Sequence, residues 1–148
     1  GVVELKDGRL MMFIRTDAGS QYVCHSSDGG QTWSKPGPSP LASPLSPATI
    51  ERIPWTNDLL CIWNAIPADT LLQGPANPLC MATSQDEGET WSPSQIIEAN
   101  PDGWYCYTSL TFVGDRAILS YCAGDKQVGG LNRLKVLAIP RDLLTSAF

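Results

Sequence analysis

The sequence predicts an all-β protein built from repeated four-stranded antiparallel meanders. An eight-residue motif occurs twice, as 26–33 and as 84–91, with five identical positions and a separation of 58 residues. Each copy follows a short apolar run, and such runs alternate with turns rich in Gly, Pro, Asn and Asp along the chain. In addition, no stretch shows the sustained apolar period of a long amphipathic helix.

The repeated motif has the composition of a tight turn between two strands. An aspartate carboxylate accepts hydrogen bonds from nearby backbone N–H groups, and glycine adopts the positive φ that a tight turn requires. Hydroxyl groups satisfy further backbone groups, and tryptophan is a large apolar anchor. We therefore predict a structural role, rather than a catalytic or metal-binding one, for the shared positions, which are Ser26, Asp28, Gly30, Thr32 and Trp33, and Ser84, Asp86, Gly88, Thr90 and Trp91.

The chain divides into three units, at about residues 2–36, 46–98 and 104–140. The strands predicted in the first unit are Val2–Leu5, Arg9–Arg15, Gln21–Ser26 and one that begins at Thr32–Ser34. The segment Lys35–Pro47 is rich in Pro and Ser, which predicts a loop that crosses to the second unit.

The second unit repeats the scheme, and the third lacks the turn motif. In the second unit we predict strands at Ala48–Ile53, Leu59–Ile66, Leu79–Ser84 and Ser94–Glu98. The segment Pro67–Pro78 is a long irregular loop, which we expect to lie at the rim of a site. In the third unit we predict strands at Tyr105–Val113, Ala117–Cys122 and Arg133–Ile139, and then either a short helix or a ragged end.

Four-stranded meanders repeated about every 50 residues are typical of β-propeller blades. A propeller closes with about four to eight blades, whereas this chain supplies about three. Three blades alone would leave the apolar flanks of both end blades exposed. We therefore expect a single partial propeller that is either a piece of a longer chain or one half of a homodimer that closes a six-bladed ring. A β-sandwich built from the same hairpins remains an alternative.

Composition excludes several classes of function. The chain has 148 residues, is 43% hydrophobic and carries a net charge of −5, so it has no basic stripe for binding nucleic acid. Its longest apolar runs are too short to span a bilayer, so no membrane segment is expected. The five cysteines contain no C-x-x-C pair and there is a single histidine, so we expect free buried thiols, no metal and no cofactor. This cysteine usage fits a cytoplasmic or a secreted protein.

The repeated motif resembles the Asp-box (S-x-D-x-G-x-T-W) of the sialidase superfamily, where it joins the outer two strands of a propeller blade away from the catalytic face. The resemblance extends to the segment 2–10 and Arg15, which is similar to the V-V-E-L-x-D-G-R-L…R block of the fourth sialidase blade. The whole chain is similar, in order, to blades four to six of bacterial sialidase-like proteins with BNR repeats.

The resemblance implies a site for an anionic, sialic-acid-like sugar. Arg15 lies where the second of three substrate-carboxylate arginines belongs, and the planar arginine fork suits a carboxylate. Tyr107 lies at the position of the family's tyrosine nucleophile. Ser46 and Asn64 lie where family members line the rim of the pocket. Without the resemblance, Arg15 would simply end a strand in solvent, and Tyr107 would share one strand face with Tyr105 as a packing aromatic.

Departures from the family pattern predict that this chain carries only part of the family's catalytic and substrate-binding residues. The glutamate that activates the tyrosine should precede Val2, and Ala76 occupies the place of the third arginine. The first arginine and the acid/base aspartate belong to the first two blades of the family, which are absent here. One hypothesis is therefore a sialidase-like glycosidase fragment that needs a missing N-terminal half or a partner chain. The other is a non-catalytic carbohydrate-binding or structural module. For the remaining tryptophans, Trp55, Trp63 and Trp104, we expect core packing rather than sugar stacking.

Overall fold

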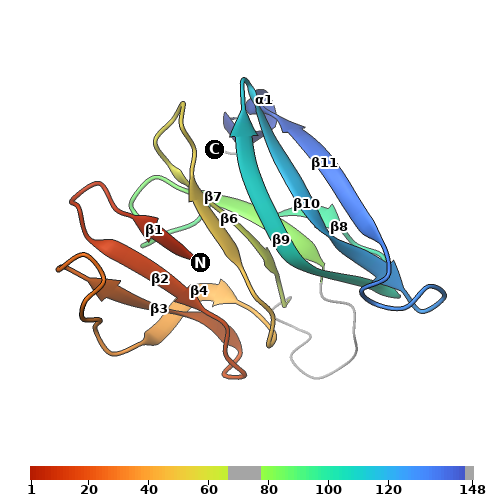
Figure 1. Ribbon diagram of the computed structural model, residues 1–148, viewed down its shortest axis with the longest axis horizontal. Coiled ribbons are helices and arrows are strands. Elements are labelled where there is room, and N and C mark those ends of the chain that lie inside the picture. Colours follow the sequence, from red (N-terminus) through yellow and green to blue (C-terminus); the bar gives the residue numbers. More distant parts are fainter. Residues whose placement is uncertain (67–77, 146–148) are drawn as a thin grey trace.

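A computed structural model describes residues 1–66 and 78–145, and over these residues the chain forms three antiparallel β-sheets followed by a short helix (Figure 1). The prediction of an all-β fold made of propeller blades is confirmed. The elements are β1 (Val2–Glu4), β2 (Leu10–Ile14), β3 (Ser20–Ser26), β4 (Gly37–Ala42), β5 (Thr49–Arg52), β6 (Leu59–Asn64), β7 (Leu79–Ser84), β8 (Gln95–Glu98), β9 (Gly103–Val113), β10 (Arg116–Asp125), β11 (Leu134–Pro140) and α1 (Arg141–Thr145).

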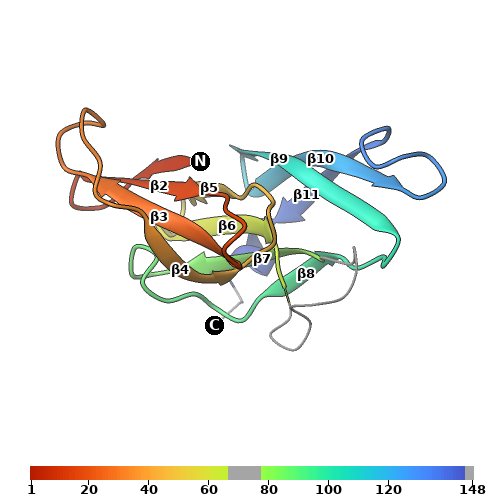
Figure 2. The ribbon, with the colours of Figure 1, turned by 90° about the horizontal axis from the view of Figure 1, so that it is seen from below.

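Each sheet is a meander whose strands pair in chain order. The first sheet runs β1-β2-β3-β4, the second β5-β6-β7-β8 and the third β9-β10-β11. The sheets succeed one another across the molecule, with the second between the other two (Figures 1 and 2). The first strands of successive sheets are neighbours, since β1 contacts β5 and β5 contacts β9. This is the arrangement of consecutive propeller blades around an axis.

The fourth strand of the first sheet differs from the prediction. It was expected to begin at Thr32–Ser34, with a loop over Lys35–Pro47, but β4 covers Gly37–Ala42 inside that segment. The prolines at positions 38 and 40 argued for a loop because proline donates no backbone hydrogen bond. In the structure β4 is the outermost strand of its sheet, where a missing N–H on the free side is tolerated.

The second sheet is buried on both faces, which explains its unbroken apolar strands. Every residue of β6 and β7 is buried. Alternate residues enter different cores, because successive side chains of a strand point to opposite faces. Leu60 and Ile62 pack with the third sheet, whereas Leu59, Cys61 and Trp63 pack with the first. The second sheet therefore holds the three-sheet stack together.

The third sheet is the last of the three sheets along the chain and is followed by the helix α1. Its three strands lie close to the predicted ranges, and β11 is a mostly exposed edge strand. The helix α1 follows β11 directly and buries Leu144 against the core shared by the second and third sheets. Of the two endings expected after Pro140, the structure thus shows the short helix, over Arg141–Thr145.

Both copies of the repeated motif fold as turns closed by their own side chains. Asp28 accepts hydrogen bonds from the Thr32 backbone N–H at 2.9 Å, the Thr32 hydroxyl at 2.6 Å and the Ser26 hydroxyl at 2.8 Å. Asp86 accepts the matching bonds from Thr90 and Ser84 at 2.9, 2.5 and 2.8 Å. These bonds, those of the threonine side chain foremost, lower the pKa of both aspartates to about 2.

The second turn also ties the first sheet to the second. Glu87 accepts hydrogen bonds from the Arg52 guanidinium at 3.0 and 2.7 Å and from the Lys6 backbone N–H at 2.7 Å. Burial opposes ionisation of Glu87, but the bonds from Arg52 and Lys6 outweigh it and lower the pKa of that carboxyl. Arg52, the other arginine of the second unit, is therefore held in an ion pair and does not reach the site described below.

Candidate functional site

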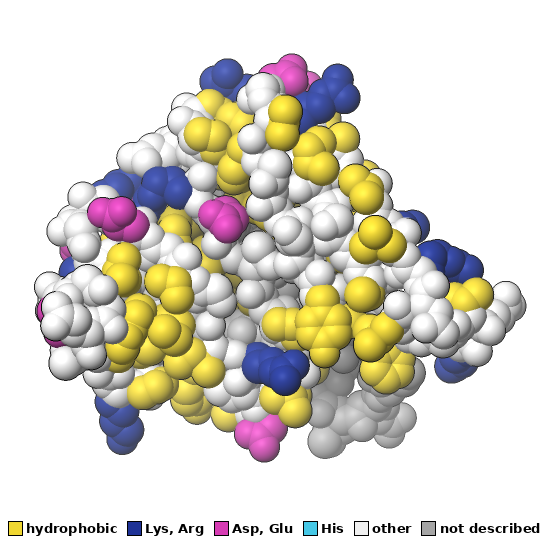
Figure 3. Space-filling model, in the orientation of Figure 1, with side chains coloured by type: hydrophobic (Ala, Val, Ile, Leu, Met, Phe, Trp, Pro, Cys, Tyr) yellow, Lys and Arg dark blue, Asp and Glu magenta, His cyan; other side chains and the backbone are white. Residues whose placement is uncertain are grey.

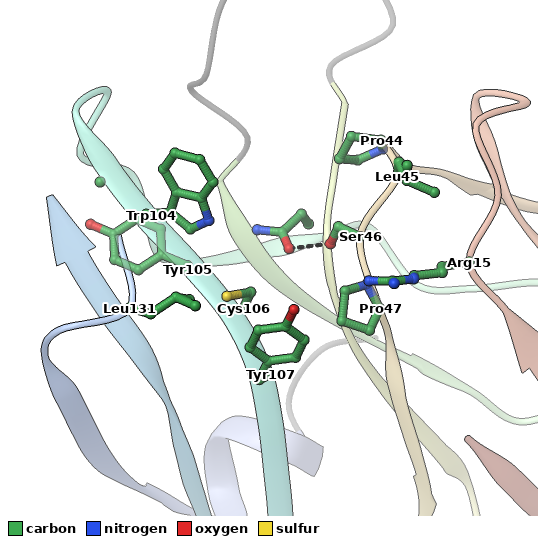
Figure 4. A pocket seen from close by; sticks show the side chains of 12 residues that line it. Arg15, Pro44, Leu45, Ser46, Pro47, Trp104, Tyr105, Cys106, Tyr107 and Leu131 are labelled. Atoms are coloured by element: carbon green, nitrogen blue, oxygen red, sulfur yellow. Dashed lines mark hydrogen bonds between the residues drawn. The ribbon is translucent and has the colours of Figure 1, made fainter. Parts of the chain in front are cut away.

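A hollow of about 330 Å³ opens where the three sheets meet (Figure 4). One wall is the segment that links β4 to β5, and the other is the beginning of β9, with the end of β6 between them. The residues that line the hollow are Arg15, Pro44, Leu45, Ser46, Pro47, Asn64, Gly103, Trp104, Tyr105, Cys106, Tyr107 and Leu131.

All four residues expected at a binding site from the sequence line this one hollow. Arg15 directly follows β2, Ser46 lies in the link between β4 and β5, Asn64 is the last residue of β6, and Tyr107 lies within β9. They are up to 92 positions apart in the chain and come from all three sheets. The fold therefore assembles a cation, a hydroxyl, a carboxamide and a phenol around a common space.

Tyr107 occupies an irregular point of β9. Its φ is +52°, which non-glycine residues rarely adopt. Between the pairs Ser120–Ser109 and Cys122–Cys106, β9 holds one residue more than β10, so a β-bulge interrupts the ladder. As a result Tyr107 is 58% exposed, whereas Tyr105 is 8% exposed. The expectation that both tyrosines share one environment on a regular strand face is therefore wrong, because the bulge breaks the two-residue alternation.

Contacts between sheets hold the walls of the hollow in place. Thr49 on β5 donates a hydrogen bond of 2.8 Å to the Thr108 carbonyl, next to Tyr107. Gln21 on β3 is fully buried and donates to the Ser43 hydroxyl and to the Ser46 carbonyl, both at 2.7 Å. The Ser46 hydroxyl in turn donates to the Asn64 side-chain oxygen. Such supporting bonds fix polar groups of a site before any ligand binds.

Charge in the hollow is one-sided. Arg15 is the one charged side chain among the described residues that line it. Glu51 lies in an adjoining hollow of about 370 Å³ that also includes Tyr107, and burial raises the pKa of Glu51 against the opposing effect of the amino terminus. Behind Tyr105, the Tyr121 hydroxyl donates to Glu98 at 2.6 Å, and burial followed by the Glu98 charge raises the pKa of Tyr105.

Three apolar side chains at this site were not predicted from the sequence. Trp104, Leu45 and Leu131 line the hollow, and they are 59%, 63% and 56% exposed. The prediction of core packing is correct for Trp63, which is 4% exposed, and wrong for Trp104. Trp104 stands at the start of β9, where it alternates with the buried Tyr105. The signal available in the sequence was this alternation, which places one of two consecutive aromatic residues on the open face.

Two sequence expectations fall outside the described residues. Ala76, at the place of the third carboxylate arginine, lies in the segment 67–77 that the structure does not describe. The same holds for nearly all of the loop 67–78 that was expected at the rim of the site. Over residues 1–66 and 78–145, no cluster of three His, Cys, Asp or Glu side chains could hold a metal ion. No helix in this described part is long and apolar enough to cross a membrane.

A comparison with protein families matches residues 1–120 to the BNR repeat-like domain. The chain belongs to this family. The match covers the first two sheets with both Asp-boxes and continues into β9 and β10, so it includes Arg15, Ser46, Asn64 and Tyr107. A search of curated protein sequences finds no match to this chain.

Solved structures of similar fold come from carbohydrate-processing enzymes. The intramolecular trans-sialidase from Ruminococcus gnavus, solved with oseltamivir carboxylate, is 20% identical, with a TM-score of 0.68 over 97% of this chain and 32% of that chain. A leech intramolecular trans-sialidase is 21% identical, with a TM-score of 0.69 over 98% of this chain and 24% of that chain. An α-L-arabinofuranosidase from Fusarium graminearum is 18% identical, with a TM-score of 0.67 over 95% of this chain and 44% of that chain.

These similarities show that this chain shares its fold with parts of the two trans-sialidases and of the arabinofuranosidase. Our chain spans less than half of the length of each of these three proteins. The prediction of a BNR-repeat, sialidase-like partial propeller is confirmed at the level of fold and family.

Proposed function

We propose that this chain forms part of the sugar-binding site of a glycoside-hydrolase-like propeller, and that Arg15 binds the carboxylate of a sialic-acid-like sugar there. The observation that carries the proposal is the single hollow lined by Arg15, Ser46, Asn64 and Tyr107. The proteins of similar fold support it, since they are described as trans-sialidases and an arabinofuranosidase. The hollow has the mixture of apolar wall and few polar groups that is typical of ligand sites.

An anionic sugar suits the charge of the hollow better than a neutral one. The Arg15 guanidinium can donate two parallel hydrogen bonds to a carboxylate and keeps its charge at any physiological pH. No described residue that lines the hollow carries a negative charge to compensate it. A neutral sugar such as arabinose would leave this cation without a counter-charge, so among the sugars suggested by the similar folds we favour the sialic-acid-like one.

Tyr107 would act as the nucleophile if the site is catalytic. A phenol does not repel the substrate carboxylate, but its ordinary pKa of about 10 means that a base must take its proton. The described residues that line the hollow include no carboxylate and no imidazole. Glu51 lines only the adjoining hollow, so we propose that the acidic groups for hydrolysis come from another part of a longer chain or from a partner chain that completes the ring.

The mass of the assembly in solution tests which part completes the ring, because the two arrangements have different masses. A second copy of this chain would give a homodimer of two half-rings with twofold symmetry. A missing N-terminal half would instead leave this chain a monomer that binds that half. Native mass spectrometry of the purified chain at several concentrations distinguishes the two.

The alternative function is a carbohydrate-binding or structural module without catalysis. The lack of an acidic group among the described residues of the hollow favours it. A fluorogenic sialoside separates the two functions. The glycosidase proposal expects turnover by the ring-completed assembly and its loss in Tyr107→Phe, whereas the module expects none in either. Turnover that persists in Tyr107→Phe would remove Tyr107 as the nucleophile.

Binding of free N-acetylneuraminic acid to the 148-residue chain tests the shared part of both functions. We expect Arg15→Ala to weaken binding, measured by calorimetry, by about a hundredfold, because a charge-assisted pair is lost. Arg9→Ala is the matched control, since Arg9 directly precedes β2 as Arg15 directly follows it, pairs with Asp7 at 2.7 Å and does not line the hollow. Equal binding by wild type and Arg15→Ala would refute the role of Arg15.

A further inference from the structure

Trp104 presents an exposed aromatic face at the mouth of the hollow. Trp104 is 59% exposed, although a tryptophan normally buries most of its surface. Figure 4 shows the indole beside the hollow, with its ring nitrogen turned toward the side on which Ser46 lies. Trp104 is not a member of either hydrophobic core cluster of the described residues.

The indole is supported from behind by the backbone of Gly130. A Cβ atom added to Gly130 would lie 2.8 Å from Trp104 Cδ2 and 3.0 Å from Cγ, so the glycine backbone lies directly against the ring. The loop that carries Gly130 is closed by hydrogen bonds from Gly124 N–H to the Gly130 carbonyl at 3.2 Å and from Gly129 N–H to the Asp125 carbonyl at 2.9 Å. The ring is therefore backed on one side before any ligand binds.

Two further apolar side chains extend the exposed surface. Leu131 and Leu45 line the same hollow and are 56% and 63% exposed. Figure 3 shows hydrophobic side chains gathered on this face, over the beginning of β9 and beside a basic side chain. A cluster of exposed apolar groups at the rim of a polar pocket is typical of a binding surface.

The order of groups across the hollow indicates a ligand of more than one ring. In Figure 4, Arg15 lies on one side and Trp104 on the other, with Ser46 and Tyr107 between them. We propose that Trp104 is a stacking platform for the second sugar of an oligosaccharide whose anionic end is bound at Arg15. The apolar C–H face of a pyranose fits a flat indole, while its hydroxyls stay in water. This inference rests on the proposed function and names its ligand as a sialyl-oligosaccharide.

Three sugars test the platform on the 148-residue chain by calorimetry: N-acetylneuraminic acid, lactose and sialyllactose. We expect wild type to bind sialyllactose more tightly than N-acetylneuraminic acid. Trp104→Ala should lose about tenfold in affinity for sialyllactose, the size of one good stacking contact, and nothing for the monosaccharide. Trp104→Phe should keep most of the difference. Gly130→Ala should reduce it, because its Cβ would push the indole from its place.

The outcomes separate this inference from the proposed function. Equal effects of Trp104→Ala on sialyllactose and on the monosaccharide, or none on either, overturn the platform and leave the role of Arg15 standing. Failure of wild type to bind any of the three sugars overturns both. Binding of lactose that depends on Trp104 but not on Arg15 supports the platform and overturns the anionic specificity. Because Trp104 is mostly exposed, its variants should fold, and circular dichroism checks this.

A separate observation concerns two cysteines beside Tyr107. Cys106 on β9 lies directly opposite Cys122 on β10 in the antiparallel register. Both are free, and burial, followed by the neighbouring Cys122 thiol, raises the pKa of Cys106. Directly opposite residues of antiparallel strands have Cα atoms about 4.5–5.5 Å apart, which is within the range that a disulfide bridges.

We infer that Cys106 and Cys122 form a cross-strand disulfide when a small disulfide such as oxidised glutathione is supplied. One cysteine thiolate attacks the reagent, whose S–S bond breaks and releases one thiolate. The second cysteine thiolate then attacks the mixed disulfide, the protein S–S bond forms, and a second reagent thiolate leaves. The two protons from the cysteines go to the released thiolates, so two protein thiols are oxidised and one reagent disulfide is reduced.

Mass spectrometry after incubation with oxidised glutathione tests this. We expect the chain to lose two hydrogen atoms and to yield a single cross-linked peptide pair, which joins Cys106 to Cys122. Cys106→Ser and Cys122→Ser should each abolish the cross-link. Cys24, Cys61 and Cys80 pair with no cysteine in the registers of the described strands and serve as internal controls. A cross-link that involves these cysteines instead, or retention of stable glutathione adducts at positions 106 and 122, would contradict the inference.

Discussion

The Thr49 hydroxyl donates a hydrogen bond of 2.8 Å to the Thr108 carbonyl, and the two threonine hydroxyls lie 2.6 Å apart. This pair joins the first strands of the second and third sheets, β5 and β9. Thr108 follows Tyr107 directly, at the point where the β-bulge interrupts pairing with β10. The backbone that carries Tyr107 is therefore held by the neighbouring sheet rather than by its own ladder.

Thr49→Val should destabilise the protein and loosen the bulge. Valine keeps the shape of threonine but leaves the partly buried Thr108 carbonyl without its donor, which costs about 1–3 kcal/mol. Urea denaturation followed by far-UV circular dichroism measures the change. Thr111→Val on β9 is the matched control, because it is the same substitution at an exposed position and leaves the bond to Thr108 in place. This variant should change the free energy of unfolding by no more than about 0.5 kcal/mol.

Tyr107→Gly should be more stable than Tyr107→Ala by about 1 kcal/mol, because glycine adopts a φ of +52° without strain, whereas an L side chain does not. Both variants remove the phenol and should bind sugar less well. At Tyr22 on β3, whose φ is not positive, the order should reverse, because glycine weakens a strand that alanine tolerates. Thermal denaturation of the four variants provides the comparison. If the alanine variant were the more stable one at both positions, the conformation of Tyr107 would carry no strain.

The two Asp-box aspartates should make the protein acid-sensitive below about pH 4. Their pKa values are about 2 in the folded chain, lower than in an unfolded chain. A depressed carboxyl pKa contributes stability that is complete above the unfolded pKa and is lost as the pH falls through the folded one. The free energy of unfolding should therefore decline from about pH 4 toward pH 2. The Asp28→Asn/Asp86→Asn variant should show a shallower decline, and an identical pH profile would contradict the assignment.

Arg52 and Glu87 should be energetically coupled within the second sheet, where Arg52 ends β5 and Glu87 lies in the turn between β7 and β8. Their side chains are each 21% exposed and meet through two hydrogen bonds, of 3.0 and 2.7 Å. A double-mutant cycle with alanine at both positions should give a coupling energy between about 0.5 and 1 kcal/mol, because the pair is partly screened by water. The exposed pair Arg9–Asp7, with side chains 48% and 53% exposed, should show much weaker coupling. Equal coupling in the two pairs would argue against a special role for Glu87.

The sequence predicted much of the fold because the informative features are local. Ser26, Asp28 and Thr32 form their hydrogen bonds within a few residues of one another, so the turn can be read from composition and repeated order. The strands β5 to β11 lie close to their expected ranges for the same reason. The strand β4 was missed because its prolines are typical of loops, and only its place at the sheet edge makes them acceptable.

The candidate site was predictable only in part. A resemblance to a known family suggested Arg15, Ser46, Asn64 and Tyr107, and the fold places all four around one hollow. The alternation of Trp104 with Tyr105 indicated that one of the two would face outward, but nothing in the order of residues indicated that Trp104 would lie against Gly130 or that Cys106 would lie opposite Cys122. Those relations depend on the register of β9 with β10 and on a loop more than twenty residues away in the chain.

The sequence by itself determined the all-β class, the two self-closed turns and the family, since these follow from short-range hydrogen bonding and apolar alternation. The tertiary structure decided the positive φ of Tyr107, the exposure of Trp104 and the position of Arg15 around the same hollow. Each of these depends on how neighbouring sheets pack, because the bulge in β9 is held by Thr49 of another sheet. Contacts between residues distant in the chain are set by packing, and a local pattern does not encode them.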